Sequence, residues 1–360
     1  MSALTLAYLI AGLGLLVLGA EGLVKGAAGL ARRLGGSPLT IGLTVVALGT
    51  SAPEGAVSVE AALSGRGDIA VGNALGSCIA NVLLILGLSA LVSPLAVAPR
   101  LVRFDVPVML GIGGLVFALA LNGRLGRLEG VGLLAAIGLY TLCLLRRSRG
   151  TAPSATEAQE PARPPLANLL LALVGLGLLA AGSHLFIEGA VSVARALGLS
   201  ERVIGLTLVA VGTSLPELAT SLLAVLRGER DIAVGNIVGS NIVNLTLITG
   251  SAALVAPDGL SISPNALTFD FPVMLAVFAA CVPIFLSGMR IRRWEGLLLC
   301  THYLAYILYL AMFSTGLGGF DIFRHAMSWF VLPATGTILI ASGLHAWLSP
   351  RHKPPTETDS

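Results

Sequence analysis

The chain has 360 residues, of which 55% are hydrophobic and 11% are charged, and its mean hydropathy is +0.90. Soluble domains carry about 25% charged residues, so this composition excludes a soluble globular protein and predicts an integral membrane protein. The formal net charge of +3 at pH 7 is too small to indicate a nucleic-acid partner.

Membrane-spanning helices are the first elements that the sequence predicts. A helix needs about 20 apolar residues to cross a bilayer, and eleven stretches of the chain are close to that length or longer. They predict an all-α integral membrane fold. In chain order the predicted spans are 3–24, 38–64, 69–92, 104–121, 127–145, 166–187, 202–226, 232–256, 268–287, 294–313 and 327–348.

A polar segment, RRSRGTAPSATEAQEPARPP (146–165), separates the fifth predicted span from the sixth. Its composition, rich in Pro and Ala, is typical of a short disordered linker. Cytoplasmic loops are enriched in Lys and Arg, so we place the N-terminus outside, which assigns this linker and most other basic loop residues to the cytoplasm. The prediction is a multi-pass protein of the cell (inner or plasma) membrane with a cytoplasmic C-terminus.

The chain contains an internal repeat. Residues 40–87 align with 203–250 without a gap at an offset of 163, and 29 of the 48 aligned pairs are identical. GTSAPE (49–54) matches GTSLPE, and GDIAVGNALGSCIAN (67–81) matches RDIAVGNIVGSNIVN. The best-matched stretches contain the polar residues, which a duplication kept only for its apolar faces explains poorly.

Weaker matches extend the repeat to five spans, since RFDVPVML (103–110) resembles TFDFPVML further along. Five is an odd number, so the second copy enters the membrane from the opposite side. Inverted repeats of this kind are typical of secondary transporters, whose substrate site lies near the bilayer midplane. The predicted domains are a first repeat (1–145), the linker (146–165), a second repeat (166–315), and an extra helix with a polar tail (316–360).

Proline and glutamate occur together in the second predicted span. Pro53 lacks an N–H, so the helix should break between Gly49 and Pro53. Backbone carbonyls released in a membrane are tolerated only in a protein-lined or wet cavity, where they are ligands for cations, and Glu54 adds charge there. Spacing of three and four residues puts further oxygens on the same helix face. That face comprises Thr50, Ser51, Glu54 and Ser58, and its copy around Pro216 comprises Thr213, Ser214, Glu217 and Ser221.

The third and eighth predicted spans each present a stripe of side-chain oxygens at every fourth position. The stripes are Asn73, Ser77 and Asn81 in the first copy, and Asn236, Ser240 and Asn244 in the second. Hard oxygen ligands without His or Cys suit Ca²⁺ and Na⁺ better than zinc or copper. Two carboxylates balance one Ca²⁺, two Na⁺ or two protons. For Asn73 and Asn236, a hydrogen bond between helices is an equally good interpretation.

The paired motifs GTS-x-PE and GN-xx-GS-xxx-N resemble the two α-repeats of the cation/calcium exchanger superfamily, close to prokaryotic sodium/calcium antiporters, over the first ten predicted spans. The resemblance implies a ten-helix inverted-repeat fold. It implies a Ca²⁺ site made by Glu54 and Glu217 with the carbonyls of Thr50 and Thr213. It also implies Na⁺ ligands from Ser51, Ser77, Ser214, Ser240 and the carbonyls of Ala47 and Ala210, with Asn81 close by.

This sequence departs from the family pattern at several positions. Many relatives have an aspartate where this chain has Asn244, which leaves the ratio of Na⁺ to Ca²⁺ open. Potassium-dependent relatives also use an acid there, which argues against K⁺ cotransport. Glu60 has no acidic counterpart, because Leu223 matches it, and the eleventh span is an addition to the ten-helix fold.

The predicted function is a secondary active antiporter that exchanges Na⁺ for Ca²⁺ by alternating access at a central two-glutamate site, in the direction of Ca²⁺ efflux. Two alternatives stay open: a Ca²⁺/H⁺ antiporter, since buried carboxylates can also bind protons, and a passive cation channel with a glutamate filter. The sequence contains no enzyme motif that we identify. We predict no cofactor, the lipid bilayer as surroundings, and no particular protein partner.

Overall fold

The computed structural model describes residues 3–34, 37–148, 164–196, 210–315 and 319–348. Within these residues, eight helices are long and apolar enough to cross a membrane, so the predicted all-α membrane class is confirmed. With the π-helical segments that continue some of them, they are α1 (Ala3–Leu34), α5–η2–α6 (Gly67–Ala80, Asn81–Leu86, Gly87–Val92), η3–α7 (Leu101–Asp105, Val106–Ala120), α8 (Arg127–Ser148), α9 (Pro165–Ala196), α13–η5–α14 (Arg230–Val243, Asn244–Ile248, Thr249–Val255), η6–α15 (Ala266–Asp270, Phe271–Leu286) and α16 (Arg293–Thr315).

The second and seventh predicted spans are broken helices, as their prolines predict. The first is divided into α2 (Pro38–Ile41), η1 (Gly42–Val46), α3 (Ala47–Thr50) and α4 (Ala52–Leu63), and in the second α11 (Ala210–Thr213) precedes α12 (Leu215–Leu226). Ser51 and Ser214 leave helical geometry, with ψ of 5° and 8°. Each proline stands at the second position of the helix that follows, where its missing N–H breaks no intrahelical bond. The start of the seventh predicted span, 202–209, lies outside the described residues.

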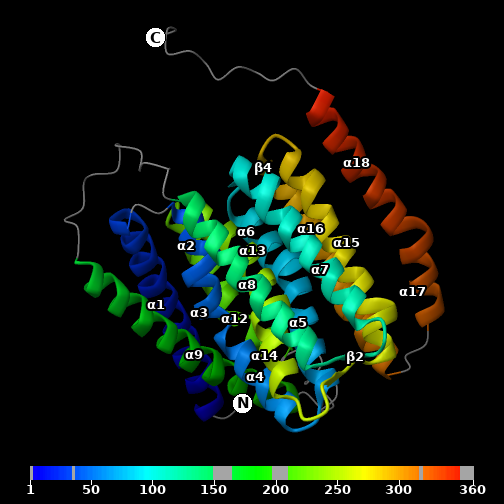
Figure 1. The fold of residues 1–360 in the computed structure, drawn as a ribbon, viewed down its shortest axis with the longest axis horizontal. Coiled ribbons are helices and arrows are strands. Elements are labelled where there is room, and N and C mark those ends of the chain that lie inside the picture. The colour runs from blue at the N-terminus through cyan, green and yellow to red at the C-terminus, as the bar shows by residue number, and fades with distance from the viewer. Residues whose placement is uncertain (1–2, 35–36, 149–163, 197–209, 316–318, 349–360) are drawn as a thin grey trace.

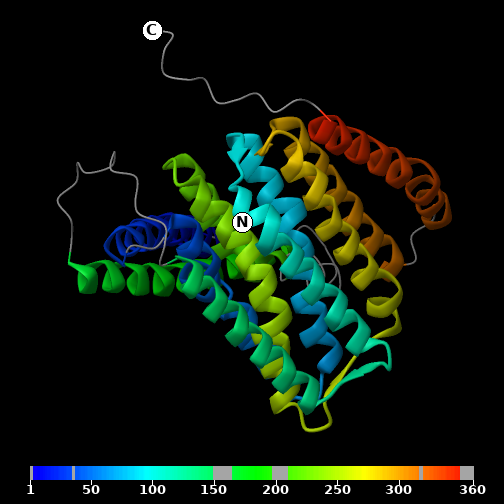
Figure 2. The same ribbon diagram turned by 45° about the horizontal axis from the view of Figure 1, so that its top comes forward.

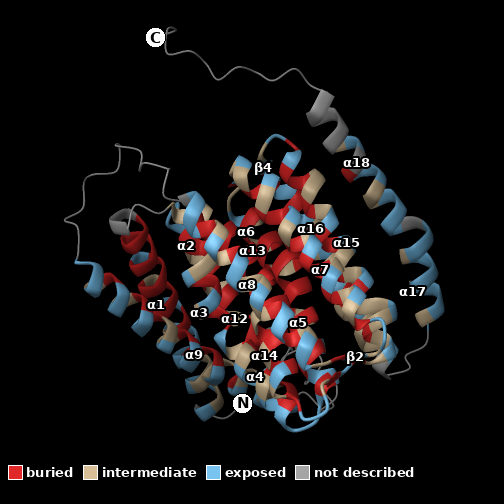
Figure 3. Cartoon of the chain, in the orientation of Figure 1, coloured by how far each residue is buried: buried red, intermediate tan, exposed pale blue. Residues whose placement is uncertain are grey.

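The two broken helices and the spans that follow them lie in the middle of the bundle, whereas other helices cover it. In the most apolar stretches of Arg230–Val255 and Gly67–Val92, 94% and 72% of the residues are buried, compared with 22–44% for the other six spans described. Buried residues are concentrated in α5 and α13, and exposed residues on the outer helices (Figure 3). The polar stripes therefore belong to the most enclosed helices of the described protein.

Helices α1 and α9 lie side by side along one side of the bundle (Figures 1 and 2). Glycines allow their backbones to approach: a Cβ atom built on Gly12 or Gly182 would lie 2.9 Å from the carbonyl oxygen of the other. Close backbone approach at small residues is typical of membrane helix pairs. Both helices are longer than the predicted spans 3–24 and 166–187, because the Ala-, Leu- and Arg-rich sequence beyond those stretches also favours helix.

Two short antiparallel strand pairs link the halves of the chain. β1 (Leu95–Ala96) pairs with β4 (Arg290–Ile291), and β2 (Arg124–Leu125) pairs with β3 (Leu260–Ser261). Each pair joins a loop of residues 1–145 to a loop of residues 166–315. The halves are therefore connected at the ends of the bundle as well as through its centre.

A further helix lies on the side of the bundle opposite α1 and α9 (Figure 1). It comprises α17 (Phe320–Ala326), η7 (Met327–Val331) and α18 (Leu332–Leu348), and α18 packs against α15. The eleventh predicted span, 327–348, falls within this helix, which begins earlier than predicted.

Candidate ion-binding site

Two carboxylates lie at the centre of the described bundle. Glu54 and Glu217 occupy the first turns of α4 and α12, directly after the two helix breaks, and both are fully buried. Ser51 Oγ donates a hydrogen bond to Glu217 Oε1 at 2.9 Å, and Ser214 Oγ donates one to Glu54 Oε1 at 3.2 Å. Each carboxylate is thus bonded to the serine of the other motif. The N-terminal ends of α4 and α12 also favour negative charge at these positions.

Several buried side-chain atoms of the two repeated motifs have no hydrogen-bond partner among the described residues. They are Glu54 Oε2, Glu217 Oε2, Ser240 Oγ, Asn81 Oδ1, and Asn244 Oδ1 and Nδ2. No ion pair between described residues includes either glutamate. Burying an uncompensated carboxylate costs several kcal/mol, and a hard cation that accepts oxygen ligands would remove that cost. The donor set fits a cation of this kind.

The ligand set consists of two carboxylates and neutral oxygens. In the described part of the chain, no group of three or more His, Cys, Asp and Glu side chains is placed to hold a metal ion. Ser77 is buried, and its Oγ lies 3.3 Å from Ser214 Oγ, so the stripe of the third span reaches the crossed serine–glutamate pairs. Thr213 and Ser240 are buried as well.

The expectation that the break releases carbonyls holds only in part. The Ala47 carbonyl still accepts the Ser51 N–H at 3.1 Å and lies 3.4 Å from Thr50 Oγ1, so it has not lost its backbone partner. Pro53 has no N–H to donate to the carbonyl of Gly49, four residues earlier. The Ser51 N–H, which bonds to the Ala47 carbonyl, is also directed at this Gly49 carbonyl. Ala210 begins α11, and its side chain lies outside the described residues.

Asn73 and Asn236 make hydrogen bonds between helices. Asn73 Nδ2 donates to Ser58 Oγ at 3.0 Å and to the Glu54 carbonyl at 3.1 Å. Asn236 Nδ2 donates to Ser221 Oγ at 3.0 Å, and Asn236 Oδ1 accepts from Thr50 Oγ1 at 3.1 Å. Of the two interpretations of these asparagines, the structure therefore favours bonding between helices, which holds each glutamate-bearing segment against the stripe of the next span.

Close packing of α13 against α2, η1 and α3 depends on glycine. A Cβ atom built on Gly235 would lie 2.8 Å from the Leu39 carbonyl, and one built on Gly239 would lie 2.7 Å from the Leu43 carbonyl. For Gly72 and Gly76 no described atom lies within 4 Å of such a Cβ. Gly72 and Gly76 are the repeat counterparts of Gly235 and Gly239. Because Gly235 and Gly239 face residues 39–47, Gly72 and Gly76 would be expected to face the counterpart of that segment in the second copy. The corresponding segment of the second copy begins at 202, and 202–209 lie outside the described residues.

The sequence analysis missed Asn241, which is fully buried. Asn81 Nδ2 donates to Asn241 Oδ1 at 3.1 Å, and Asn241 Nδ2 lies 3.5 Å from Met109 Sδ. The repeat counterpart of Asn241 is Cys78, which directly follows the Ser77 of the stripe, so the two copies differ in polarity next to identical stripes. A polar Asn241 in place of the apolar Cys78 was the feature of the sequence that could have identified this residue. Asn81 is consequently held by an amide, whereas the amide of its counterpart Asn244 has no described partner.

Both stripes enter a π-helical segment at their last asparagine. η2 begins at Asn81 and η5 begins at Asn244. π-helical turns within α-helices are found frequently at functional sites. The two asparagines therefore lie at matched helix irregularities in the two copies of the motif.

Known proteins resemble this chain over most of its length. Residues 4–146 and 167–312 match the family described as sodium/calcium exchanger protein. The putative antiporter CaxA of Alkalimonas amylolytica is 40% identical over 279 residues, which are 75% of this chain and 87% of that protein. The sodium/calcium exchanger MaX1 of Methanosarcina acetivorans is 33% identical over 313 residues, covering 76% of this chain and 89% of that protein.

The fold is also similar to solved structures of the sodium-calcium exchanger NCX_Mj. The structure soaked with 2.5 mM Na⁺ and 0.1 mM Sr²⁺ has a TM-score of 0.74 and 33% sequence identity, and the similarity covers 86% of this chain and 99% of that one. The family match stops before the helix that begins at Phe320.

Proposed function

Because this chain belongs to the sodium/calcium exchanger protein family, we propose that it exchanges Na⁺ for Ca²⁺ at the site formed by Glu54 and Glu217. It is a multi-pass membrane transporter and not an enzyme, and the ions are substrates rather than cofactors. The finer assignments below, namely the site, the mechanism and the direction, are our proposals.

The observation that carries the proposal is the pair of fully buried carboxylates with unpartnered oxygens on both. Two negative charges are balanced by one Ca²⁺ or by two Na⁺. Both ions require the same carboxylate oxygens, so the binding of one excludes the other. Mutually exclusive binding at one site is what an exchanger needs, because the site is then exposed to each side of the membrane in turn while it holds one ion or the other.

Alternating access is supported by the correspondence between the two halves. The span Gly67–Val92 and the span Arg230–Val255 have the same outer bounds at an offset of 163, and the two strand pairs each join one half to the other. We propose that residues 1–145 and 166–315 are inverted repeats that move against each other around the crossed serine–glutamate pairs. With the N-terminus outside and Na⁺ entering down its gradient, the exchange extrudes Ca²⁺.

The deciding experiment is ⁴⁵Ca²⁺ uptake into Na⁺-loaded proteoliposomes that contain the purified chain. We expect uptake to require the outward Na⁺ gradient and to persist when an ionophore collapses any pH gradient. Uptake driven by a proton gradient without Na⁺ would identify a Ca²⁺/H⁺ antiporter instead. Uptake that needs no counter-ion would identify a channel.

The Asn241→Ala variant should bind Ca²⁺ severalfold more weakly, because Asn81 loses the amide that orients it, and ordering a freed side chain on binding costs on the order of 1 kcal/mol. The measurement is ⁴⁵Ca²⁺ binding to the purified protein. The matched control is Cys78→Ala, at the repeat counterpart, whose thiol donates one weak hydrogen bond, to the Asn241 backbone carbonyl at 3.7 Å. We expect little change for that control. Equal effects at the two positions would contradict the role that we assign to Asn241.

A further inference from the structure

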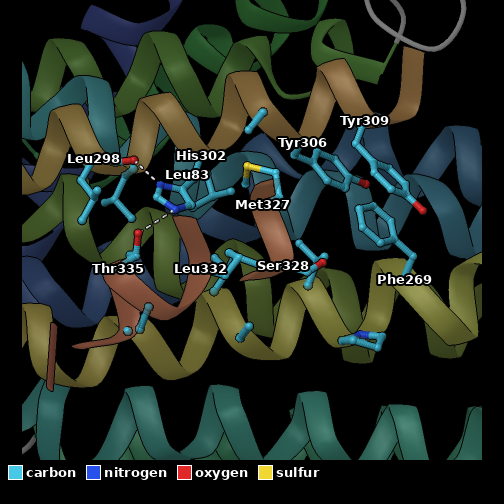
Figure 4. Close-up of a pocket in the computed structure, with 18 of the residues that line it drawn as sticks. Leu83, Phe269, Leu298, His302, Tyr306, Tyr309, Met327, Ser328, Leu332 and Thr335 are labelled. Carbon is cyan, nitrogen blue, oxygen red and sulfur yellow. Dashed lines mark hydrogen bonds between the residues drawn. The ribbon is translucent and has the colours of Figure 1, made fainter. Parts of the chain in front are cut away.

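A cavity of about 680 Å³ lies between α15, α16 and the helix that runs from α17 to α18 (Figure 4). Its volume is within the range of about 300–1,000 Å³ that is typical of small-molecule sites. One of its walls is the helix after Phe320, which lies outside the part of the chain that matches the exchanger family. Neither Glu54 nor Glu217 lines the cavity.

The walls of the cavity are mostly apolar, and several of their polar groups already have partners. His302 Nδ1 lies 2.8 Å from the Leu298 carbonyl, and His302 Nε2 lies 3.2 Å from Thr335 Oγ1. The Tyr306 hydroxyl donates to Asp270 Oδ1 at 3.1 Å. The cavity has room for about 20 waters, but a buried water needs about three hydrogen bonds. These walls therefore favour an apolar occupant over water.

One end of the cavity differs from the rest. There Tyr309 stacks on Phe269 with ring centroids 3.6 Å apart, and Arg324 lines the same cavity. Arg324 is largely exposed and pairs with Asp321 at 3.2 Å. A guanidinium has five N–H donors, so this pair leaves donors for a phosphate, which arginine binds well. Tyrosine is enriched where membrane helices meet the headgroup region.

The other end of the cavity is formed by aliphatic side chains and by the hydrogen-bonded His302–Thr335 pair. Leu298, Leu332 and Thr335 lie there, and Figure 4 shows a row of side chains leading from them to Tyr309 and Phe269. Leu83 of η2 contributes to the wall, two residues after Asn81. The space is therefore elongated and mostly apolar, and at one end Arg324 offers guanidinium donors beside the carboxylates of Asp321 and Asp270.

We propose that this cavity binds a phospholipid with a net negative headgroup, with one acyl chain along α15 and α18 and the phosphate at Arg324. The chemistry of the walls matches the two parts of such a molecule. The bilayer surrounds these helices and supplies the lipid. Binding at this site does not depend on which ion the carboxylate pair transports.

The test uses the full chain in nanodiscs with two photoactivatable probes, phosphatidylglycerol and phosphatidylcholine, each carrying a diazirine at the end of the same acyl chain. We expect labelled peptides from α15 and α18 to dominate. Ala280→Phe, which fills the cavity, should reduce that labelling severalfold, and the milder Ala276→Leu should reduce it partly. Ile338→Phe is the matched control, because Ile338 is 51% exposed and does not line the cavity, and labelling should stay unchanged.

Arg324→Gln should lower labelling by phosphatidylglycerol more than labelling by phosphatidylcholine, because the choline cation already offsets the phosphate charge of phosphatidylcholine. Size-exclusion profiles establish that each variant is folded. The site is overturned if neither Ala280→Phe nor Ala276→Leu changes labelling, or if cavity peptides are labelled no more than the exposed face of α9. The headgroup assignment is overturned if the two lipids label the unaltered chain equally and Arg324→Gln does not change their ratio.

Discussion

Replacing Glu54 or Glu217 by glutamine should abolish Na⁺-driven Ca²⁺ uptake while the protein stays folded. Either change removes one of the two buried negative charges and leaves the other to bind the cation alone. Removing a carboxylate from its buried pairing with a cation costs about 3–5 kcal/mol. At about 1.4 kcal/mol per factor of ten, the affinity for the cation becomes at least 100-fold weaker. The measurement is ⁴⁵Ca²⁺ flux in proteoliposomes, with ⁴⁵Ca²⁺ binding to the purified variants.

Glu60→Gln is the matched control, since Glu60 belongs to the same helix as Glu54 but is exposed. The same chemical change there should leave uptake close to that of the unaltered chain. Normal flux in Glu54→Gln or Glu217→Gln would exclude the two-glutamate site. A large loss in Glu60→Gln would instead assign an ion-attracting role to the end of α4.

The second large effect is expected for Asn244→Asp. Asn244 is fully buried, and neither of its side-chain polar atoms has a partner among the described residues. A carboxylate at this position would add a third buried negative charge beside the pair, and a buried charge without a counter-ion costs several kcal/mol. The Na⁺-loaded state should therefore take up an additional Na⁺. The Hill slope for Na⁺ should rise, and the reversal potential of the exchange should shift.

These quantities are measured as the Na⁺ dependence of ⁴⁵Ca²⁺ uptake and as uptake at clamped membrane potentials. Asn122→Asp serves as the control: Asn122 is exposed, and its Oδ1 accepts the Arg124 N–H at 2.9 Å, which an aspartate also does. An unchanged Hill slope and reversal potential in Asn244→Asp would show that this position does not set the number of Na⁺ ions bound.

Local features of the sequence predicted much of the architecture. The length of its apolar stretches predicted a multi-pass helical membrane protein, because the thickness of the bilayer sets that length. Pro53 and Pro216 predicted the helix breaks, because a missing N–H acts on the backbone of its own turn. The repeated motifs identified the exchanger family, which the comparisons confirm. The assignment of ligands to Ca²⁺ and Na⁺ stays a prediction.

Contacts between distant parts of the chain were beyond local reasoning. The residues of the Ser51–Glu217 and Ser214–Glu54 bonds are more than 150 positions apart, and so are those of the Asn81–Asn241 bond. The spacing of residues within one helix places side chains on a face, but it does not say which face of which other helix they meet. For the same reason the cavity beside Arg324 could not be predicted from the sequence.

By itself, the sequence of this protein determined its membrane class, its two helix breaks and the paired glutamates, since each depends on residues close together in the chain. Only the tertiary structure decided that each glutamate is bonded to the opposite serine, that Asn73 and Asn236 hold helices together, and that Asn81 is restrained while Asn244 has no described partner. Those outcomes depend on how the two halves pack, because a buried polar atom bonds to whatever the packing brings within about 3 Å.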